Sequence, residues 1–131
     1  MKKITKSKLI FLKKKSFQLR LQIIEYTKLK GSFLGACFSC MDLIIYLYNH
    51  FLKINKKNIS SNTRDTFILS KGHSAPALYA VLKDAKIINK NLFLSDKTYW
   101  HPEKSIKGVD FQTGALGHGL SVGIGFAKYY K

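Results

Sequence analysis

The sequence predicts an α/β fold that is mostly helical and forms one domain, residues 1–131. The chain has 131 residues, of which 46% are hydrophobic, enough for one core of ordinary size. Most segments repeat apolar residues at helical spacing. One apolar run, residues 66–70, is predicted as a strand. It leads into a glycine turn and a further helical pattern, an arrangement typical of α/β proteins.

A long amphipathic helix is predicted for residues 7–30. Lysines cover much of its surface, and the apolar side chains recur three and four positions apart: Phe17, Leu19, Leu21, Ile23, Ile24 and Tyr26. A basic amphipathic helix can lie on a membrane. Covering a core with one face is the commoner arrangement, and we expect it here.

A second helix is predicted to begin after Gly31 and Gly35. Ser39 with Asp42 three positions later forms a capping-box pattern before an apolar run. The side chains expected to face inward are Leu43, Ile44, Leu47 and Phe51. The helix is expected to end in the lysine- and asparagine-rich residues 53–62.

Four segments complete the predicted organisation. They are a helix over 74–84 with Pro76 in its first turn, a short helix over 90–96, an irregular loop over 99–113 and a helix over 116–130. No internal repeat divides the chain, which supports one domain.

The charge of +16 raises the possibility of a nucleic-acid partner. The lysines are scattered along the whole chain, and arginine, which suits bidentate recognition of phosphates, occurs only at Arg20 and Arg64. We interpret the lysines as a solvated surface. Binding of a polyanion stays open as the alternative.

Cys37 and Cys40 form a lone C-x-x-C pattern, which occurs in redox pairs and in halves of zinc sites. No second ligand pair follows, and the neighbouring residues are apolar, so two small buried residues near a helix start are predicted. Two cysteines indicate a reducing compartment. The apolar run 43–48 is too short to span a bilayer. With no targeting signal visible, a soluble, cytoplasmic protein is expected.

Three segments stand apart from ordinary patterning. Residues 70–73 (SKGH) end the predicted strand at a helix start, where a diphosphate can bind and His73 can donate a hydrogen bond. In 100–103 (WHPE), Trp and Pro flank His101, which suits a proton-transferring group. Residues 113–125 contain five glycines. This number indicates a backbone that must closely approach a ligand or another helix. Each segment also has a purely structural interpretation, as a helix cap, a solvated loop or a packing surface.

Taken in order, these segments resemble the N-terminal region of transketolases. The resemblance covers about residues 20–131. Its tightest parts are RDTFILSKGH at 64–73, HPE at 101–103 and GVDxxTGxLGxGLS at 108–121. The dinucleotide fingerprint is not met, because Val122 stands where its third glycine belongs.

The resemblance implies a thiamine-diphosphate-dependent enzyme that moves a two-carbon ketol unit from a ketose, such as a sugar phosphate, to an aldose. It implies that His73 lies near the diphosphate, that His101 contacts the donor hydroxyl, and that both are catalytic. It implies that the backbone of Gly114, Ala115 and Leu116 lies against the cofactor, which is held through a divalent metal, Mg²⁺. A homodimer or a separate C-terminal subunit is also implied, with no membrane and no specific nucleic acid as partner.

The sequence departs from the family pattern in three places. Ser32–Phe33 stands where the family has Gly-His, and His118 where it commonly has Gln. The family's metal-diphosphate motif, a Gly-Asp-Gly, is absent; Asp96 and Asp110 lack its context. We therefore expect an incomplete domain, truncated before that motif and inactive alone, with no metal ligand of its own. A non-catalytic binding module derived from the same fold is the second hypothesis.

Overall fold

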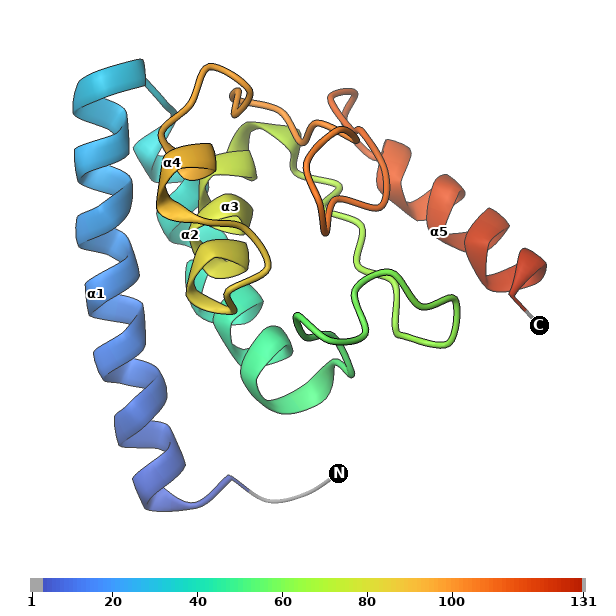
Figure 1. Ribbon diagram of the computed structural model, residues 1–131, viewed down its shortest axis with the longest axis horizontal. Coiled ribbons are helices and arrows are strands. Elements are labelled where there is room, and N and C mark those ends of the chain that lie inside the picture. Colours follow the sequence, from blue (N-terminus) through green and yellow to red (C-terminus); the bar gives the residue numbers. More distant parts are fainter. Residues whose placement is uncertain (1–3, 131) are drawn as a thin grey trace.

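The structure is a computed structural model, and it describes residues 4–130. Three helices pack pairwise at its centre: α1 (Lys6–Lys30), α2 (Leu34–Tyr46) and α3 (Ala75–Asp84). Figure 1 shows α1 along one side of this group and α5 (His118–Tyr129) projecting at the opposite side. Three of the lysines expected to be solvated, Lys2, Lys3 and Lys131, lie outside the described residues.

The first helix confirms the prediction for residues 7–30. The Thr5 hydroxyl caps it by accepting a hydrogen bond from the Lys8 N–H, and it ends at Gly31, whose φ of 70° favours glycine. Its buried residues are Leu12, Ser16, Leu19, Ile23 and Tyr26. Phe17 is 65% exposed and Leu21 46% exposed, so the inward orientation predicted for these two residues is wrong. Apolar side chains occur on several sides of this helix. The periodicity of the sequence alone therefore does not identify the face that packs against the core.

Helix α2 begins at Leu34, five residues before the predicted capping box. Ser39 lies inside the helix and donates to the Ala36 carbonyl at 2.9 Å. Asp42 instead accepts a hydrogen bond from Ser16 at 2.5 Å and pairs with Arg20 of α1. The predicted cap is therefore wrong, because the carboxylate is used between helices.

The inner face of α2 also differs from the prediction. Met41, Ile44 and Ile45 are buried, whereas Leu43 is exposed. A wider π-helical turn, η1 (Leu47–Phe51), follows directly and leaves Phe51 exposed. This turn shifts the helical phase, so positions counted from α2 no longer face the core.

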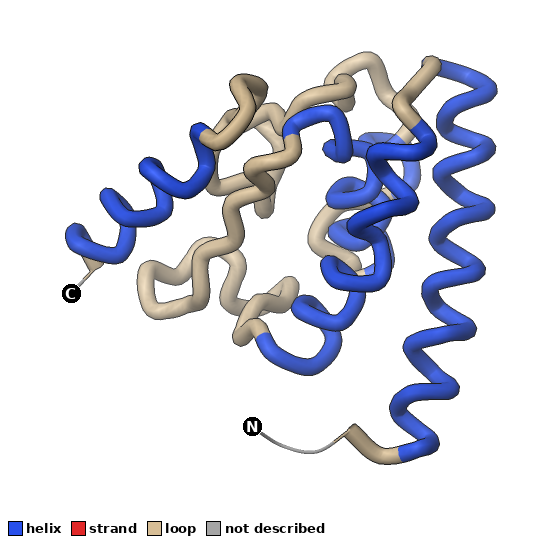
Figure 2. Tube along the Cα trace, turned by 180° about the vertical axis from the view of Figure 1, so that it is seen from behind, coloured by secondary structure: helices blue, strands red, loops and turns tan. Residues whose placement is uncertain are grey.

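The predicted strand over 66–70 is not formed. A strand requires a partner, and no other segment of residues 4–130 forms a ladder with this one. Its backbone groups bond elsewhere: the Phe67 N–H donates to Asp110 and the Leu69 carbonyl accepts from Thr113. Figure 2 shows only helices and loops in the described chain. Helical content is confirmed, and the α/β class is not shown.

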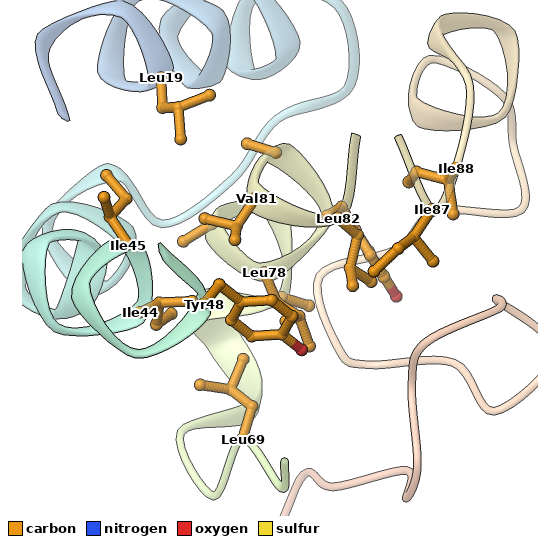
Figure 3. Close-up of a cluster of buried hydrophobic side chains, with 14 of the residues drawn as sticks. Leu19, Ile44, Ile45, Tyr48, Leu69, Leu78, Val81, Leu82, Ile87 and Ile88 are labelled. Atoms are coloured by element: carbon orange, nitrogen blue, oxygen red, sulfur yellow. The ribbon is translucent and has the colours of Figure 1, made fainter. Parts of the chain in front are cut away.

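Helix α3 is the centre of the core. It follows a single 3₁₀ turn, η2 (Gly72–Ser74), has Pro76 in its first turn, and confirms the prediction for 74–84. Its residues from Ala75 to Leu82 are all buried. Figure 3 shows Leu78, Val81 and Leu82 between the side chains of α1 and α2 and those of Ile87 and Ile88. All sides of this helix are covered.

Two helices complete the fold. The short α4 (Lys90–Phe93) is capped by Asn89 and ends three residues before the predicted Asp96. Helix α5 falls within the predicted range 116–130. The segment from Tyr99 to Thr113 is irregular, as predicted. Within the described part of the chain, no helix combines the length and apolarity needed to cross a membrane.

Candidate functional site

The turn at residues 70–73 directs His73 toward the loop that carries His101. Gly72 makes this approach possible: a Cβ there would lie 2.8 Å from His101 Cδ2 and 3.0 Å from the Thr113 carbonyl oxygen. It would also lie 3.1 Å from the Gly114 Cα. Three segments that are distant in sequence therefore meet at a position that only glycine fits.

His73 and His101 are neighbours in space. Their ring centroids are 4.8 Å apart with an interplanar angle of 60°, and both side chains are half-buried. The structure thus brings together the two residues predicted as catalytic. Two imidazoles at this separation place several hydrogen-bond donors and acceptors on one side of the fold.

Phe33 packs edge-on against His73, with ring centroids 4.9 Å apart at 86°. Its other neighbour is Trp100, at 5.5 Å and 81°. The Trp100 Nε1–H donates to the Gly31 carbonyl at 3.1 Å, which fixes the indole against the α1–α2 connection. Phe33 therefore contacts the predicted site and is not a core residue.

Tyr79 holds the loop that carries His101. The Tyr79 hydroxyl donates to the His101 carbonyl at 2.8 Å and accepts from the Glu103 N–H at 3.0 Å. The ring is fully buried in α3, and burial raises the pKa of the hydroxyl. This residue was not among those predicted from the sequence. A tyrosine among alanines and leucines was the available signal, because a buried hydroxyl requires a partner.

A groove of about 630 Å³ opens beside His101. It is lined by Tyr99, Trp100, His101, Glu103, Gln112, Thr113 and Gly114. Of the three backbone positions implied for the cofactor, Gly114 lines the groove, whereas Ala115 and Leu116 are exposed beyond it. His73 lies behind His101 and is not part of the lining. The groove is accordingly built mainly by the loop and the glycine-rich segment.

Gly119 brings the glycine-rich segment close to Ser70. A Cβ at Gly119 would lie 2.5 Å from Ser70 Cβ and 2.8 Å from Ser70 Cα. The Gly119 N–H also donates to the Ser70 hydroxyl at 3.2 Å. Gly117, with φ 76°, forms the turn into α5. A Cβ at Gly123, another of the five glycines, would meet nothing within 4 Å, so the close approach expected of this segment is wrong at that position within the described residues.

A partly buried ion pair anchors the far end of the loop. Arg64 makes a bidentate contact with Asp110, which also accepts from the Phe67 N–H at 3.0 Å. The hydrogen bond to Asp110 raises the pKa of Arg64. Asp110 thus has a structural role.

The cysteines form no disulfide. Cys37 is buried, as predicted, whereas Cys40 is only half-buried; both lie in the first half of α2. Burial raises the pKa of the Cys37 thiol to about 11. Among residues 4–130, no three His, Cys, Asp or Glu side chains gather at one point that could hold a metal ion.

Comparison with known proteins identifies the family. The transketolase thiamine diphosphate binding domain, at the N-terminal end of those enzymes, matches residues 13–131. One of the subunits of the apulose-4-phosphate transketolase of Phocaeicola vulgatus is 34% identical over 117 residues, 86% of this chain and 41% of that protein.

Two mammalian relatives extend the likeness. The transketolases of Pongo abelii and Homo sapiens are 35% and 34% identical over 133 residues, which cover 94% of this chain. The chain spans 41% of the bacterial protein and 21% of these transketolases. With a match over most of its length, the chain belongs to the transketolase family, in its thiamine diphosphate binding domain.

Proposed function

We propose that this chain supplies part of the site of a thiamine-diphosphate-dependent enzyme that moves a two-carbon ketol unit from a ketose to an aldose. The observation that supports it most is the pairing of His73 with His101, 4.8 Å apart, beside a groove of about 630 Å³. Bacterial relatives named for apulose 4-phosphate favour a phosphorylated sugar as substrate.

The groove has features that suit the cofactor. A Cβ at Gly114 would point toward His101, 3.8 Å from Cδ2 and 3.9 Å from Nε2, so glycine keeps this side of the groove open. We assign the diphosphate to His73, the donor hydroxyl to His101, and the cofactor's flank to the backbone of residues 114–116. When bound, thiamine diphosphate supplies the carbanion that attacks the ketose carbonyl. The side chains here orient the substrate and exclude water.

The described residues form no evident binding site for the metal. No cluster of three potential ligand side chains lies within residues 4–130, and Mg²⁺ prefers several oxygen ligands. We therefore assign no metal-binding role to the described residues. We propose that the ligands of the metal lie outside the described residues. We accordingly expect residues 1–131 alone to be inactive.

A partner chain follows from the same proposal. Two of the bacterial relatives are named as subunits of their enzymes, and we infer either a C-terminal-type transketolase subunit or a second copy of this chain as partner. We infer a cytoplasmic location, supported by two free thiols. We propose no specific nucleic acid as a binding partner of the lysines.

Trp100, the only tryptophan of the chain, reports on the groove that it lines. Thiamine diphosphate with Mg²⁺ is titrated against the purified chain, first alone and then with a C-terminal-type transketolase subunit, while tryptophan fluorescence and two-carbon transfer are followed. Saturable quenching and transfer are expected when that subunit is present. Neither is expected at micromolar cofactor without it.

One variant tests the role assigned to His101, and a second variant serves as its control. His101→Ala is expected to lower transfer by about 10²–10⁴-fold, as for other positioned proton-transferring groups. His50→Ala, in the distant η1 turn, is the control and is expected to leave transfer unchanged. Full transfer by the His101 variant, or no cofactor binding in any assembly, would overturn the proposal and favour the non-catalytic binding module.

A further inference from the structure

A second groove, which shares no lining residue with the groove beside His101, gathers four lysines. It has a volume of about 440 Å³ and is lined by Lys56, Lys83, Lys86, Ile87, Ile88, Asn89 and Lys90. None of these residues is acidic. In sequence the lysines are unremarkable, because Lys56 lies some thirty positions from the others, which occupy the end of α3 and the start of α4.

Among the described residues, none of the four ammonium groups forms a salt bridge, although the charges of Glu25 and Asp84 act on Lys83. Within residues 4–130, the salt bridges of lysine involve only Lys15 and Lys30. Asp84, the acidic residue next to Lys83, pairs with Lys15 on α1. Like charges gathered without salt-bridge partners repel one another, so this groove favours a bound anion.

Lys83 shows the effect of this environment. Its ammonium group lies over the Phe93 ring, with Nζ 4.7 Å from the ring centroid. Partial burial, and then the nearby charge of Lys90, lower its pKa. An anion in the groove would offset both effects, because it stabilises the charged form.

The backbone at the groove is also unusual. Lys86 has φ 58° and is the only non-glycine residue with positive φ among residues 4–130. It follows the end of α3, where glycine or asparagine is favoured. The turn is secured by the Ile87 N–H, which donates to the Leu82 carbonyl at 2.9 Å. A lysine is thus held in a conformation that side chains disfavour, at the rim of a cationic groove.

We propose that this groove is a binding site for the phosphate chain of a small oligophosphate compound. Lysine is a compact point charge that recognises phosphate without demanding one geometry. Several phosphates in a row match several ammonium groups, and the buried Ile87 and Ile88 form an apolar floor beside them. The site is independent of the proposed cofactor groove, since the two share no lining residue.

The test uses the full 131-residue chain and inorganic tripolyphosphate, with ATP as a second probe, in titration calorimetry at 150 mM salt. The double variant Lys56→Gln/Lys86→Gln is compared with Lys14→Gln/Lys28→Gln, which removes the same charge from exposed positions of α1. Thermal unfolding verifies that both variants fold. We expect saturable one-to-one binding, at least tenfold weaker in the groove variant and within twofold of wild type in the control. Tighter binding of ATP than of tripolyphosphate would identify a nucleotide as the ligand, and equal binding the phosphate chain alone.

Three results would overturn the proposal. Equal weakening in both double variants would show a response to net charge only. Absence of saturable binding at millimolar tripolyphosphate would exclude a site. Loss of binding on His73→Ala, with the groove variant unaffected, would place the phosphate at the proposed cofactor groove.

Discussion

Phe33 shows how one residue separates this chain from the pattern of its family. A histidine at this position would offer a hydrogen-bond donor, whereas the phenyl ring offers an edge to His73 and to Trp100. The ring is 47% exposed, so it contributes little to the core. At the residue scale, the candidate site therefore has two histidines and an apolar wall.

Phe33→His in the assembled enzyme is expected to change turnover or donor preference more than stability. The substitution restores a donor beside His73 and removes about 0.5–1.5 kcal/mol of aromatic pairing at most. Steady-state kinetics with two donor ketoses, together with urea unfolding, measure both effects. A loss of several kcal/mol with unchanged kinetics would show that Phe33 is a core residue and that its alignment with the family histidine is wrong.

The Cys37 thiol is expected to resist alkylation. With a pKa of about 11, its thiolate fraction at pH 8 is about 0.1%, whereas a free cysteine is roughly one quarter thiolate. Labelling with iodoacetamide, followed by peptide mass spectrometry, should show Cys37 modified rapidly only after unfolding in urea. Fast modification of the native chain at pH 8 would contradict its burial.

The same thiol makes stability depend on pH. The unfolded chain loses this proton near pH 8.5 and the folded chain only near pH 11. The contribution of Cys37 is therefore complete below about pH 8.5 and declines as the pH rises toward 11. Cys37→Ala should remove this part of the alkaline decline, measured as the difference between the two unfolding curves.

At the element scale, the structure shows which patterns carried information. The ranges 7–30 and 74–84 were predictable, because a helix satisfies its own backbone hydrogen bonds. The strand predicted at 66–70 is not formed, because a strand must pair with a second segment and the local sequence does not specify that partner. The cap of α2 failed since Asp42 serves Arg20 on another helix.

Glycines gave a mixed result at the same scale. Their number in the segment 113–125 indicated close approach, and Gly119 does touch Ser70. The sequence did not distinguish Gly119 from Gly123, which faces open space. The separate roles expected of His73 and His101 followed from the family resemblance, whereas their proximity follows only from the fold.

Gly72→Ala and Gly123→Ala are expected to have opposite effects. A methyl group at Gly72 would meet the Thr113 carbonyl and the Gly114 Cα, so we expect a loss of about 1–3 kcal/mol in unfolding free energy from overpacking. At Gly123, inside α5 with open space around it, alanine should add about 0.5–1 kcal/mol through helix propensity. Chemical denaturation measures both. A neutral Gly72 variant would contradict the close contact of the three segments.

At the scale of the whole molecule, the core and the periphery differ sharply. Helices α1, α2 and α3 share one continuous core that contains the largest buried side chains. Helix α5 touches the remainder through its first turn and through Phe126, near Phe111. Figure 1 shows its outer end standing clear of the other helices. Burial of this kind depends on the complete assembly of elements, and an amphipathic pattern alone does not reveal which face stays uncovered.

This uncovered face predicts self-association of the purified chain. Leu120 and Ile124, one turn apart on α5, are 74% and 54% exposed. They line a groove of about 370 Å³ with Thr66 and Ile68. Contiguous apolar surface of this kind promotes association. We expect sedimentation velocity to show concentration-dependent association of the wild-type chain at tens of micromolar.

Leu120→Gln/Ile124→Gln should weaken that association by roughly tenfold, because two exposed apolar side chains leave the contact. Unfolding free energy should change by no more than about 0.5 kcal/mol per site, as is usual for surface positions. The matched control is Leu21→Gln/Leu29→Gln on α1, which also replaces two exposed leucines and should leave association unchanged. If the control weakens association as much as the α5 variant, exposed apolar side chains in general are responsible. If neither variant weakens it, Leu120 and Ile124 are not part of the contact surface.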